Sequence, residues 1–256
     1  MLRSISKIAA TAAVFVTLGV AGTVTAAEKI SPPAQDWQHA GIFGTFDRDQ
    51  LQRGYQVYSE VCAACHSLRQ IYFRNLEAIG FSENRVKAIA AEVEVAGEPD
   101  SDGESTTRQG KPFDRIPGPY PNEQAARAAN GGAYPPDLSL MVKARLGGAD
   151  YLYALLTGYG DAPQGMQMNE GMSFNEYFPG HQIAMPAPLS EDAVEYEDGT
   201  SASVEQMAKD VTTFLAWTAE PELEERKRLG IKVLLFLLVL TAMTYALKRK
   251  IWSDLH

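Results

Sequence analysis

Cys62-Ala63-Ala64-Cys65-His66 is the most informative motif in this chain. Two thiols three residues apart, near the end of a helix, can reach the two vinyl groups on one edge of a porphyrin. The histidine that follows then lies under the iron. The pattern is typical of a covalent attachment site for one c-type haem, with Cys62 and Cys65 as thioether residues and His66 as an axial ligand.

A redox-active dithiol, half of a zinc site, or coincidence would also produce this motif. A zinc site would need two further Cys or His ligands at matching spacing, and a thioredoxin-like dithiol would need βαβ surroundings; the sequence offers neither. The chain's 256 residues include no cysteine besides these two. Because two cysteines cannot form a disulfide framework, the fold must rest on a core or on its cofactor.

A helix is predicted immediately before the motif, from Asp47 to about Cys65. Its apolar and small residues recur at steps of three and four and therefore share one face: Leu51, Gly54, Tyr55, Tyr58, Val61, Cys62 and Cys65. Asp47 can cap the first turn, and Gln50 stands in the capping-box position. The apolar stripe ends at the cysteine pair and directs it towards the core.

Further helices are predicted after the motif from apolar periodicity and end signals, at 122–130, 137–145, 149–157 and 203–218. Ser203 and Gln206 make a second capping box. Pro221 ends the last of these helices and suits the first turn of the next one.

Two long segments carry no such periodicity. Residues 92–121 are rich in acidic residues and proline, so we expect a solvated loop insertion there rather than a docking site. Residues 158–190 are expected to be irregular. With no convincing strand in the sequence, the predicted fold class is all-α.

The N-terminus has the form of a secretory signal peptide, with Arg3 and Lys7 before an apolar run from Ile8 to Val20. Small residues at 24–27 offer a cleavage site, which predicts removal of residues 1–27; an uncleaved anchor is the alternative.

A second apolar segment, Leu229 to Leu247, predicts a transmembrane helix. Lys248-Arg249-Lys250 follows it, and positive charge marks the cytoplasmic side, so residues 28–228 are expected on the exported side and 248–256 in the cytoplasm. The alternative is a buried core helix.

The predicted exported part is strongly acidic. The chain has a formal net charge of −9, and removing the +2 of the signal segment and the +3 of residues 229–256 leaves −14 for residues 28–228. Such a field attracts basic partners and repels nucleic acid.

The second axial ligand of a haem decides between electron transfer and ligand binding. Methionine opposite histidine raises the reduction potential and closes the iron to small molecules. The candidates in the irregular region are Met166, Met168, Met172, Met185 and, as a rival, His181. Met185 is followed by Pro186-Ala187-Pro188, which stiffens the backbone there. Met141 and Met207 lie on predicted helices and are expected in the core.

Several stretches in the same order resemble the cytochrome c1 family, the haem subunits of the cytochrome bc1 complex (ubiquinol–cytochrome c oxidoreductase). They cover most of the predicted mature chain and comprise residues 53–58, 61–68, 122–130, 132–139, 144–145, 147–148, 150–151, 155–159 and 177–186, with the single C-terminal span.

The resemblance implies a class I cytochrome c-like domain with long loop insertions and one covalent haem c. It implies that Cys62 and Cys65 hold the thioethers and that His66 and Met185 ligate the iron. It also implies that Arg145 and Tyr151 lie near the propionates, and that the haem pocket is lined by Pro135 and Pro136. Some bacterial relatives add a disulfide, for which this chain has no cysteines.

The resemblance further implies cytochrome b and the Rieske iron–sulfur protein as partners in a dimeric complex, and a c-type cytochrome as electron acceptor. The chain would be a subunit of an enzyme without a bond-making site of its own, placed in a bacterial inner membrane with its haem domain in the periplasm. A free-standing tethered electron shuttle and a haem enzyme or gas sensor are the rival functions.

Overall fold

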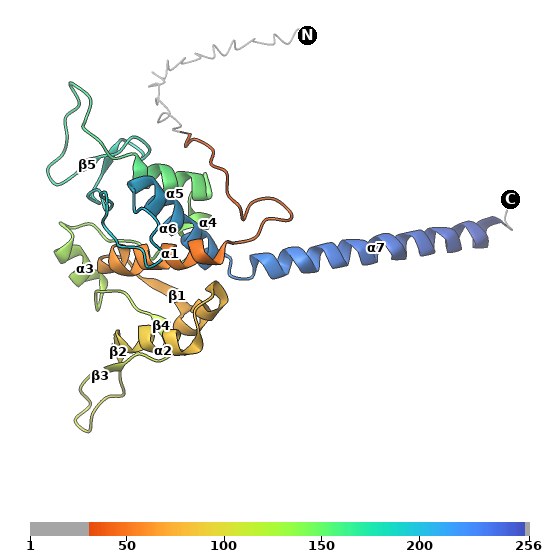
Figure 1. The fold of residues 1–256 in the computed structure, drawn as a ribbon, viewed down its shortest axis with the longest axis horizontal. Helices are drawn as coiled ribbons and strands as arrows, with labels where there is room; N and C mark the ends of the chain where they lie inside the picture. Colours follow the sequence, from red (N-terminus) through yellow and green to blue (C-terminus); the bar gives the residue numbers. More distant parts are fainter. Residues whose placement is uncertain (1–30, 254–256) are drawn as a thin grey trace, which may run out of the picture.

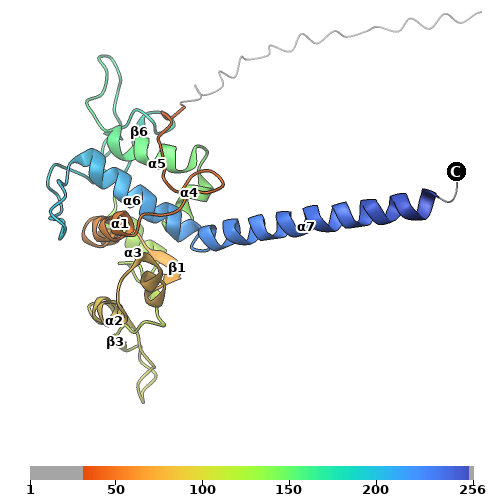
Figure 2. The same cartoon turned by 45° about the vertical axis from the view of Figure 1, so that its right-hand side comes forward.

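Two helices from distant parts of the chain cross at the centre of the fold. They are α1 (Arg48–Glu60) and α6 (Val204–Ala219), which lie against each other in both views (Figures 1 and 2). The computed structural model describes residues 31–253. The predicted signal peptide, 1–27, lies outside the described residues.

Each of these two helices begins at a side-chain cap, as predicted. Asp47 accepts hydrogen bonds from the backbone N–H groups of Asp49 and Gln50, and Ser203 accepts one from Gln206. In a capping box the glutamine side chain would also bond the backbone N–H of the N-cap residue, and this part of both predictions is wrong. Both glutamine side chains donate instead to the Asp210 carboxylate, at 3.0 and 2.9 Å.

Asp210 explains this choice. Its side chain is fully buried. A buried carboxylate without hydrogen-bond donors costs far more free energy than a backbone N–H at a helix start that water can still reach. Arg53 supplies a further charged donor, with its Nε 2.9 Å from Asp210 Oδ2. The same carboxylate therefore ties α1 to α6.

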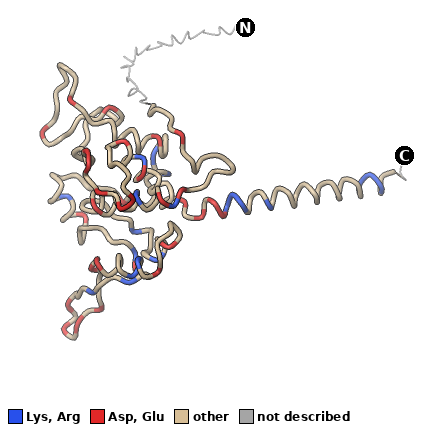
Figure 3. The backbone as a smooth tube through the Cα atoms, viewed as in Figure 1, with Lys and Arg blue, Asp and Glu red and all other residues tan. Residues whose placement is uncertain are grey.

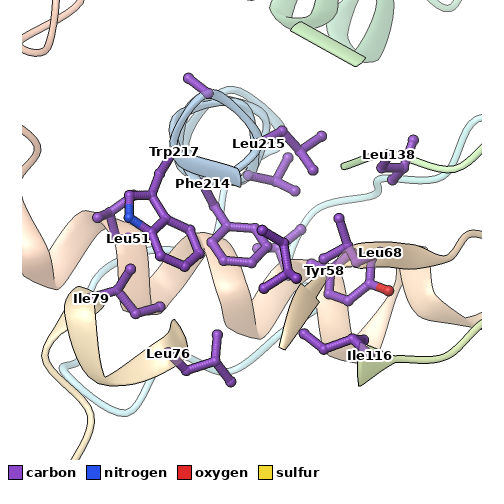
Figure 4. Close-up of a cluster of buried hydrophobic side chains, with 14 of the residues drawn as sticks. Leu51, Tyr58, Leu68, Leu76, Ile79, Ile116, Leu138, Phe214, Leu215 and Trp217 are labelled. Carbon is purple, nitrogen blue, oxygen red and sulfur yellow. The ribbon is translucent and has the colours of Figure 1, made fainter. Parts of the chain in front are cut away.

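The hydrophobic core surrounds this crossing. In Figure 4, Phe214 and Trp217 of α6 lie over Leu51 and Tyr58 of α1. Leu76, Ile79 and Ile116 lie below them and Leu68 lies beside Tyr58. These four residues belong to the segments after the haem motif and are all buried.

The structure is rich in helices but is not all-α, so that prediction is corrected. Residues 31–253 contain three two-stranded antiparallel sheets. Their strands are β1 (Leu68–Tyr72) with β4 (Arg115–Ile116), β2 (Glu94–Ala96) with β3 (Thr107–Gln109), and β5 (Ser173–Phe174) with β6 (Gln182–Ile183). Strands of two to five residues are too short to show an alternating pattern in sequence.

The expected loop at 92–121 is therefore partly regular. It holds the β2–β3 hairpin, and it returns to the core through β4, where Ile116 is buried. Arg108 forms two hydrogen bonds with the Asp114 carboxylate, at 2.6 and 2.7 Å, which fastens the base of the hairpin. The expected irregular region at 158–190 likewise contains the short β5–β6 hairpin.

The remaining helical segments of the domain are short. They are the 3₁₀ turns η1 (Cys62–Ala64) and η2 (Phe73–Ile79), and α2 (Glu83–Ala91), α3 (Glu123–Ala129), α4 (Met141–Ala144) and α5 (Gly148–Thr157). Two predicted boundaries are wrong. The helix before the motif ends at Glu60 rather than Cys65, and the helix expected at 137–145 shrinks to α4.

The last helix, α7 (Leu223–Trp252), projects away from the rest of the molecule (Figures 1 and 2). Its 30 residues span about 45 Å, and it is long and apolar enough to cross a membrane. Its apolar side chains are exposed along the length of the span, unlike those of a core helix. The helix also continues beyond Leu247, the predicted end of the span, into the basic residues seen near the C-terminus in Figure 3.

Candidate haem site

The Cys62–His66 motif lies on a tight turn directly after α1. The backbone N–H groups of Cys65 and His66 both donate to the Cys62 carbonyl, at 3.1 and 2.9 Å. Both cysteines carry free thiols and are half-buried. Burial raises the pKa of Cys62 to about 12, whereas redox-active dithiols have lowered thiol pKa values.

His66 is oriented by a backbone carbonyl. Its Nδ1 lies 2.8 Å from the carbonyl oxygen of Pro136. A carbonyl can only accept, so Nδ1 carries the proton and Nε2 is left with a free lone pair. Burial lowers the pKa of His66 below its usual value, which keeps the ring neutral. This is the state in which an imidazole ligates a metal, with its other nitrogen held as iron ligands usually are.

Asp137 fixes the carbonyl that orients His66. Its carboxylate accepts hydrogen bonds from Ser67 Oγ and from the backbone N–H groups of Arg69 and Ser139, at 2.7 to 3.0 Å. Burial alone would raise the pKa of Asp137, but these bonds outweigh burial and lower it. We expected Asp137 only as the start of a helix; the Pro-Pro-Asp-x-Ser pattern of an Asx turn was the signal for this role.

The predicted prolines lie beside the motif. Pro136 contacts His66 as described, and Pro135 lines a small cleft together with Cys65. The cleft is completed by Tyr134 and by residues at the start of α3, including Asn122 and Ala126. The structure therefore brings Cys62, Cys65, His66, Pro135 and Pro136 together.

Met185 is positioned by a second set of contacts. It follows β6, and its carbonyl accepts a hydrogen bond from the Tyr159 hydroxyl at 3.2 Å. The buried Asn175 ties the β5–β6 hairpin to α5 because its side-chain amide donates to the Leu155 carbonyl at 2.7 Å. Tyr159 was missed in the sequence, where a tyrosine after Gly158 gives no sign of a partner 26 residues away.

Arg145 and Tyr151 lie at the turn between α4 and α5 and in the first turn of α5. Arg145 is exposed in the turn between α4 and α5, and Tyr151 is half-buried on α5. Burial raises the pKa of Tyr151 and the charge of Arg145 opposes that rise. Burial also raises the pKa of Tyr159, with Tyr151 adding to the effect. Of these three side chains, Tyr159 is the one that contacts Met185, through its hydroxyl.

Within residues 31–253, no hydrogen bond or ion pair joins the His66 group to the Met185 group. The rival ligands lie in the same irregular region. Met166 and Met168 are half-buried and Met172 is exposed. The His181 ring stacks on Phe174 at 5.8 Å, with its Nδ1 buried and without a hydrogen-bond partner.

Met141 and Met207 are buried in the core, which confirms that prediction. Across the described part of the chain there is no group of three His, Cys, Asp or Glu residues that could hold a metal ion alone. Two cysteines and a neutral imidazole with one free nitrogen therefore fit a haem better than a zinc ion.

Comparison with known proteins supports this interpretation. Residues 37–255 match the model of the Cytochrome C1 family. The chain is 52% identical to cytochrome c1 of Rhodospirillum rubrum over 254 residues, covering 93% of each protein. It is 54% identical to the cytochrome b-c1 complex catalytic subunit of Candida albicans, covering 92% of this chain and 82% of the relative. It is also 54% identical to the mitochondrial cytochrome c1 heme protein of Saccharomyces cerevisiae, covering 92% and 77%. The chain belongs to the cytochrome c1 family.

Proposed function

We propose that this chain is the electron-transfer subunit of a quinol–cytochrome c oxidoreductase (bc1) complex and carries one covalently attached haem c. The observation that carries the proposal is the His66–Pro136 contact, which leaves one imidazole nitrogen free directly beside two free thiols. The complex is the enzyme. The chain itself is an electron carrier and has no assigned bond-making residue.

The proposed residue roles follow the two groups of side chains described above. Cys62 and Cys65 hold the haem thioethers, His66 ligates the iron, and Met185 is the second ligand. The bound haem supplies a one-electron couple, which methionine ligation shifts to higher potential. Family resemblance favours Met185 over His181 and the other methionines.

Arg145 and Tyr151 are proposed to bind the haem propionates, with Pro135 and Pro136 lining the pocket. A guanidinium offers paired donors to a carboxylate, and Arg145 is exposed beside the half-buried Tyr151. The Pro136 carbonyl, braced through Asp137, holds the His66 ring in one orientation and increases its basicity as a ligand. Few atoms would then need to move when the bound haem gains or loses an electron.

We propose that α7 crosses the membrane once through residues 229–247. The basic residues 248–250 then lie on the cytoplasmic side of a bacterial inner membrane, and the haem domain faces the periplasm. Removal of residues 1–27 as a signal peptide belongs to the same proposal.

The proposed partners are cytochrome b and the Rieske iron–sulfur protein, in a dimeric complex, with a c-type cytochrome as acceptor. The name of the Candida albicans relative places that protein in a cytochrome b-c1 complex. Acidic residues are spread over the haem domain (Figure 3), and their net negative field suits a basic acceptor.

A free-standing tethered shuttle would need a flexible linker between its domain and its anchor. Here Glu220 to Glu222 connect α6 directly to α7. Glu220 forms ion pairs with Lys143 of α4 at 2.7 Å and with Arg226 of α7 at 2.9 Å. A braced joint of this kind favours a fixed subunit over a mobile shuttle.

The test is purification of the tagged chain from native membranes, followed by a reduced-minus-oxidised spectrum and identification of the co-purifying chains. We expect b-type haems and an iron–sulfur protein to accompany it. A single c-type haem on an isolated chain would support the shuttle instead.

A further inference from the structure

An uncharged loop stands beside the start of α7. It runs from Trp37 to Phe46 and contains no Asp, Glu, Lys or Arg. Figures 1 and 2 both show the segment before α1 looping out alongside the first turns of α7, in the direction in which that helix leaves the domain. In Figure 3 this loop is tan between charged neighbours.

Both ends of the loop are fastened to charged groups of other elements. At the first end, Trp37 Nε1 donates to Asp150 of α5 at 2.6 Å. At the second end, the backbone N–H of Phe46 donates to Glu224 of α7 at 2.7 Å. Arg48 donates to the same Glu224 carboxylate through both terminal nitrogens. The loop is thereby held between the haem domain and the helix.

Lys227 of α7 holds the middle of the loop. Its Nζ donates to the backbone carbonyls of His39 at 2.8 Å and Gly44 at 2.9 Å. These carbonyls flank the tip, residues 40–43. Since Lys227 comes two residues before Leu229, the tip is fixed next to the point where the apolar part of α7 begins.

The tip presents two large apolar side chains to the outside. Ile42 is 70% exposed and Phe43 is 83% exposed. The His39 ring behind them stacks on Phe46 at 4.8 Å, and burial lowers its pKa, which keeps it neutral. The tip is therefore an apolar, uncharged projection on a rigid base.

We propose that Ile42 and Phe43 enter the boundary between lipid headgroups and acyl chains, as a second membrane contact of the haem domain beside α7. The inference rests on α7 spanning the membrane, as proposed above. Exposed aromatic and aliphatic side chains at the level where a span begins are the residues that the membrane interface favours. The contact would fix the height and tilt of the domain, because the loop is joined to both α5 and α7.

Lipid suits the tip better than a protein partner does. The apolar side chains of α7 are themselves exposed immediately beyond Lys227, so the tip continues the surface that meets lipid. The charge of Lys227 is directed to backbone carbonyls, and no formal charge remains on the loop to pair with a partner.

The test uses a nitroxide spin label on the full haem-loaded chain, in the purified complex reconstituted into phosphatidylethanolamine–phosphatidylglycerol vesicles. Phe43→Cys reports on the tip. Ser101→Cys, exposed in the β2–β3 hairpin far from α7, is the aqueous control, and Leu238→Cys reports on the middle of the span. Collisions with oxygen, which enters lipid, are compared with collisions with a water-soluble nickel chelate.

We expect the oxygen-to-nickel ratio at position 43 to lie well above that at 101 and below that at 238. In the Lys227→Met background, the ratio at 43 should fall while the ratio at 238 stays the same. A ratio at 43 equal to that at 101 overturns the inference. So does protection of position 43 from both reagents, which would indicate a protein partner. A low ratio at 238 would instead contradict the membrane span, and with it this inference.

Discussion

Gly54 of α1 lies directly against the backbone of α6 at Asp210. A Cβ placed on Gly54 would fall 2.7 Å from the Cβ of Phe214 and closer still to the Asp210 carbonyl oxygen. Two helices can come this close only where one of them has no side chain. The contact sets the position of α1, the helix that leads into the haem motif.

Gly54→Ala is expected to destabilise the protein by about 1–3 kcal/mol, the usual cost of overpacking. Denaturant unfolding followed by circular dichroism measures the change. Gly160→Ala is the matched control, because nothing lies within 4 Å of a Cβ at that position. Equal stability of the two variants would show that the helices can separate at no cost.

Met185→Leu is expected to lower the haem potential by more than about 100 mV, a modest part of the roughly 0.8 V that axial ligands control. Leucine cannot ligate iron, so carbon monoxide should also bind. A redox titration with a carbon monoxide difference spectrum measures both. Met172→Leu, at an exposed rival position, should change neither. An unchanged potential in Met185→Leu would rule out this residue as ligand.

Electron transfer to a basic c-type cytochrome should slow as ionic strength rises. Salt shortens the reach of the negative field, from about 10 Å at 0.1 M to about 3 Å at 1 M. Stopped-flow kinetics from low to high salt measure the slope, with a neutral small-molecule oxidant as control. A rate independent of salt would contradict electrostatic steering.

The protein should become less stable in acid, because Glu220, between α6 and α7, loses its ion pairs with Lys143 and Arg226 when it is protonated. Hydrogen bonding from Arg226, with further help from Lys143, lowers the pKa of Glu220 from 4.5 to about 2. A lowered pKa in the folded state stabilises the protein above the unfolded pKa, and that contribution is lost as pH falls from about 4.5 towards 2.

Glu220→Gln should therefore flatten the dependence of unfolding free energy on pH within that window. Glu83→Gln, in an exposed ion pair with Lys87, should leave the profile close to that of the unchanged protein. Identical profiles for all three proteins would show that the joint contributes nothing.

Deleting residues 229–256 should release a soluble domain that still binds haem. The deletion removes the exposed apolar part of α7 but keeps Glu224 and Lys227, which fasten the N-terminal loop. Gel filtration and a haem stain measure the result. Aggregation without haem would mean that the segment belongs to the core.

Local signals in the sequence predicted much of the fold. Apolar periodicity located α1, α5 and α6, and Asn122 caps α3 as expected by accepting from the Ala125 N–H. Such features depend on residues within one or two turns. The strands could not be predicted from the sequence. β1 and β4 pair across more than 40 residues, and each is too short to show an alternating pattern.

The same difference between local features and long-range contacts applies to the candidate site. The His66 motif is contiguous and could be recognised directly. The contacts that position the two proposed ligands depend on groups far away in sequence. The Pro136 carbonyl orients His66 and the Tyr159 hydroxyl bonds the Met185 carbonyl. The glutamines at 50 and 206 match a local capping pattern, yet both side chains donate to the buried Asp210. Leaving a buried charge without donors costs more free energy than losing a local capping bond.

The crossing of α1 and α6 also has a consequence for the order of events during synthesis. Roughly 140 residues separate the end of α1 from the start of α6. At about 5–20 residues per second, α6 is made on the order of ten seconds after the cysteine motif. Throughout that interval α1 lacks the helix that buries its apolar face. The core therefore cannot close around Cys62 and Cys65 until most of the domain has been made.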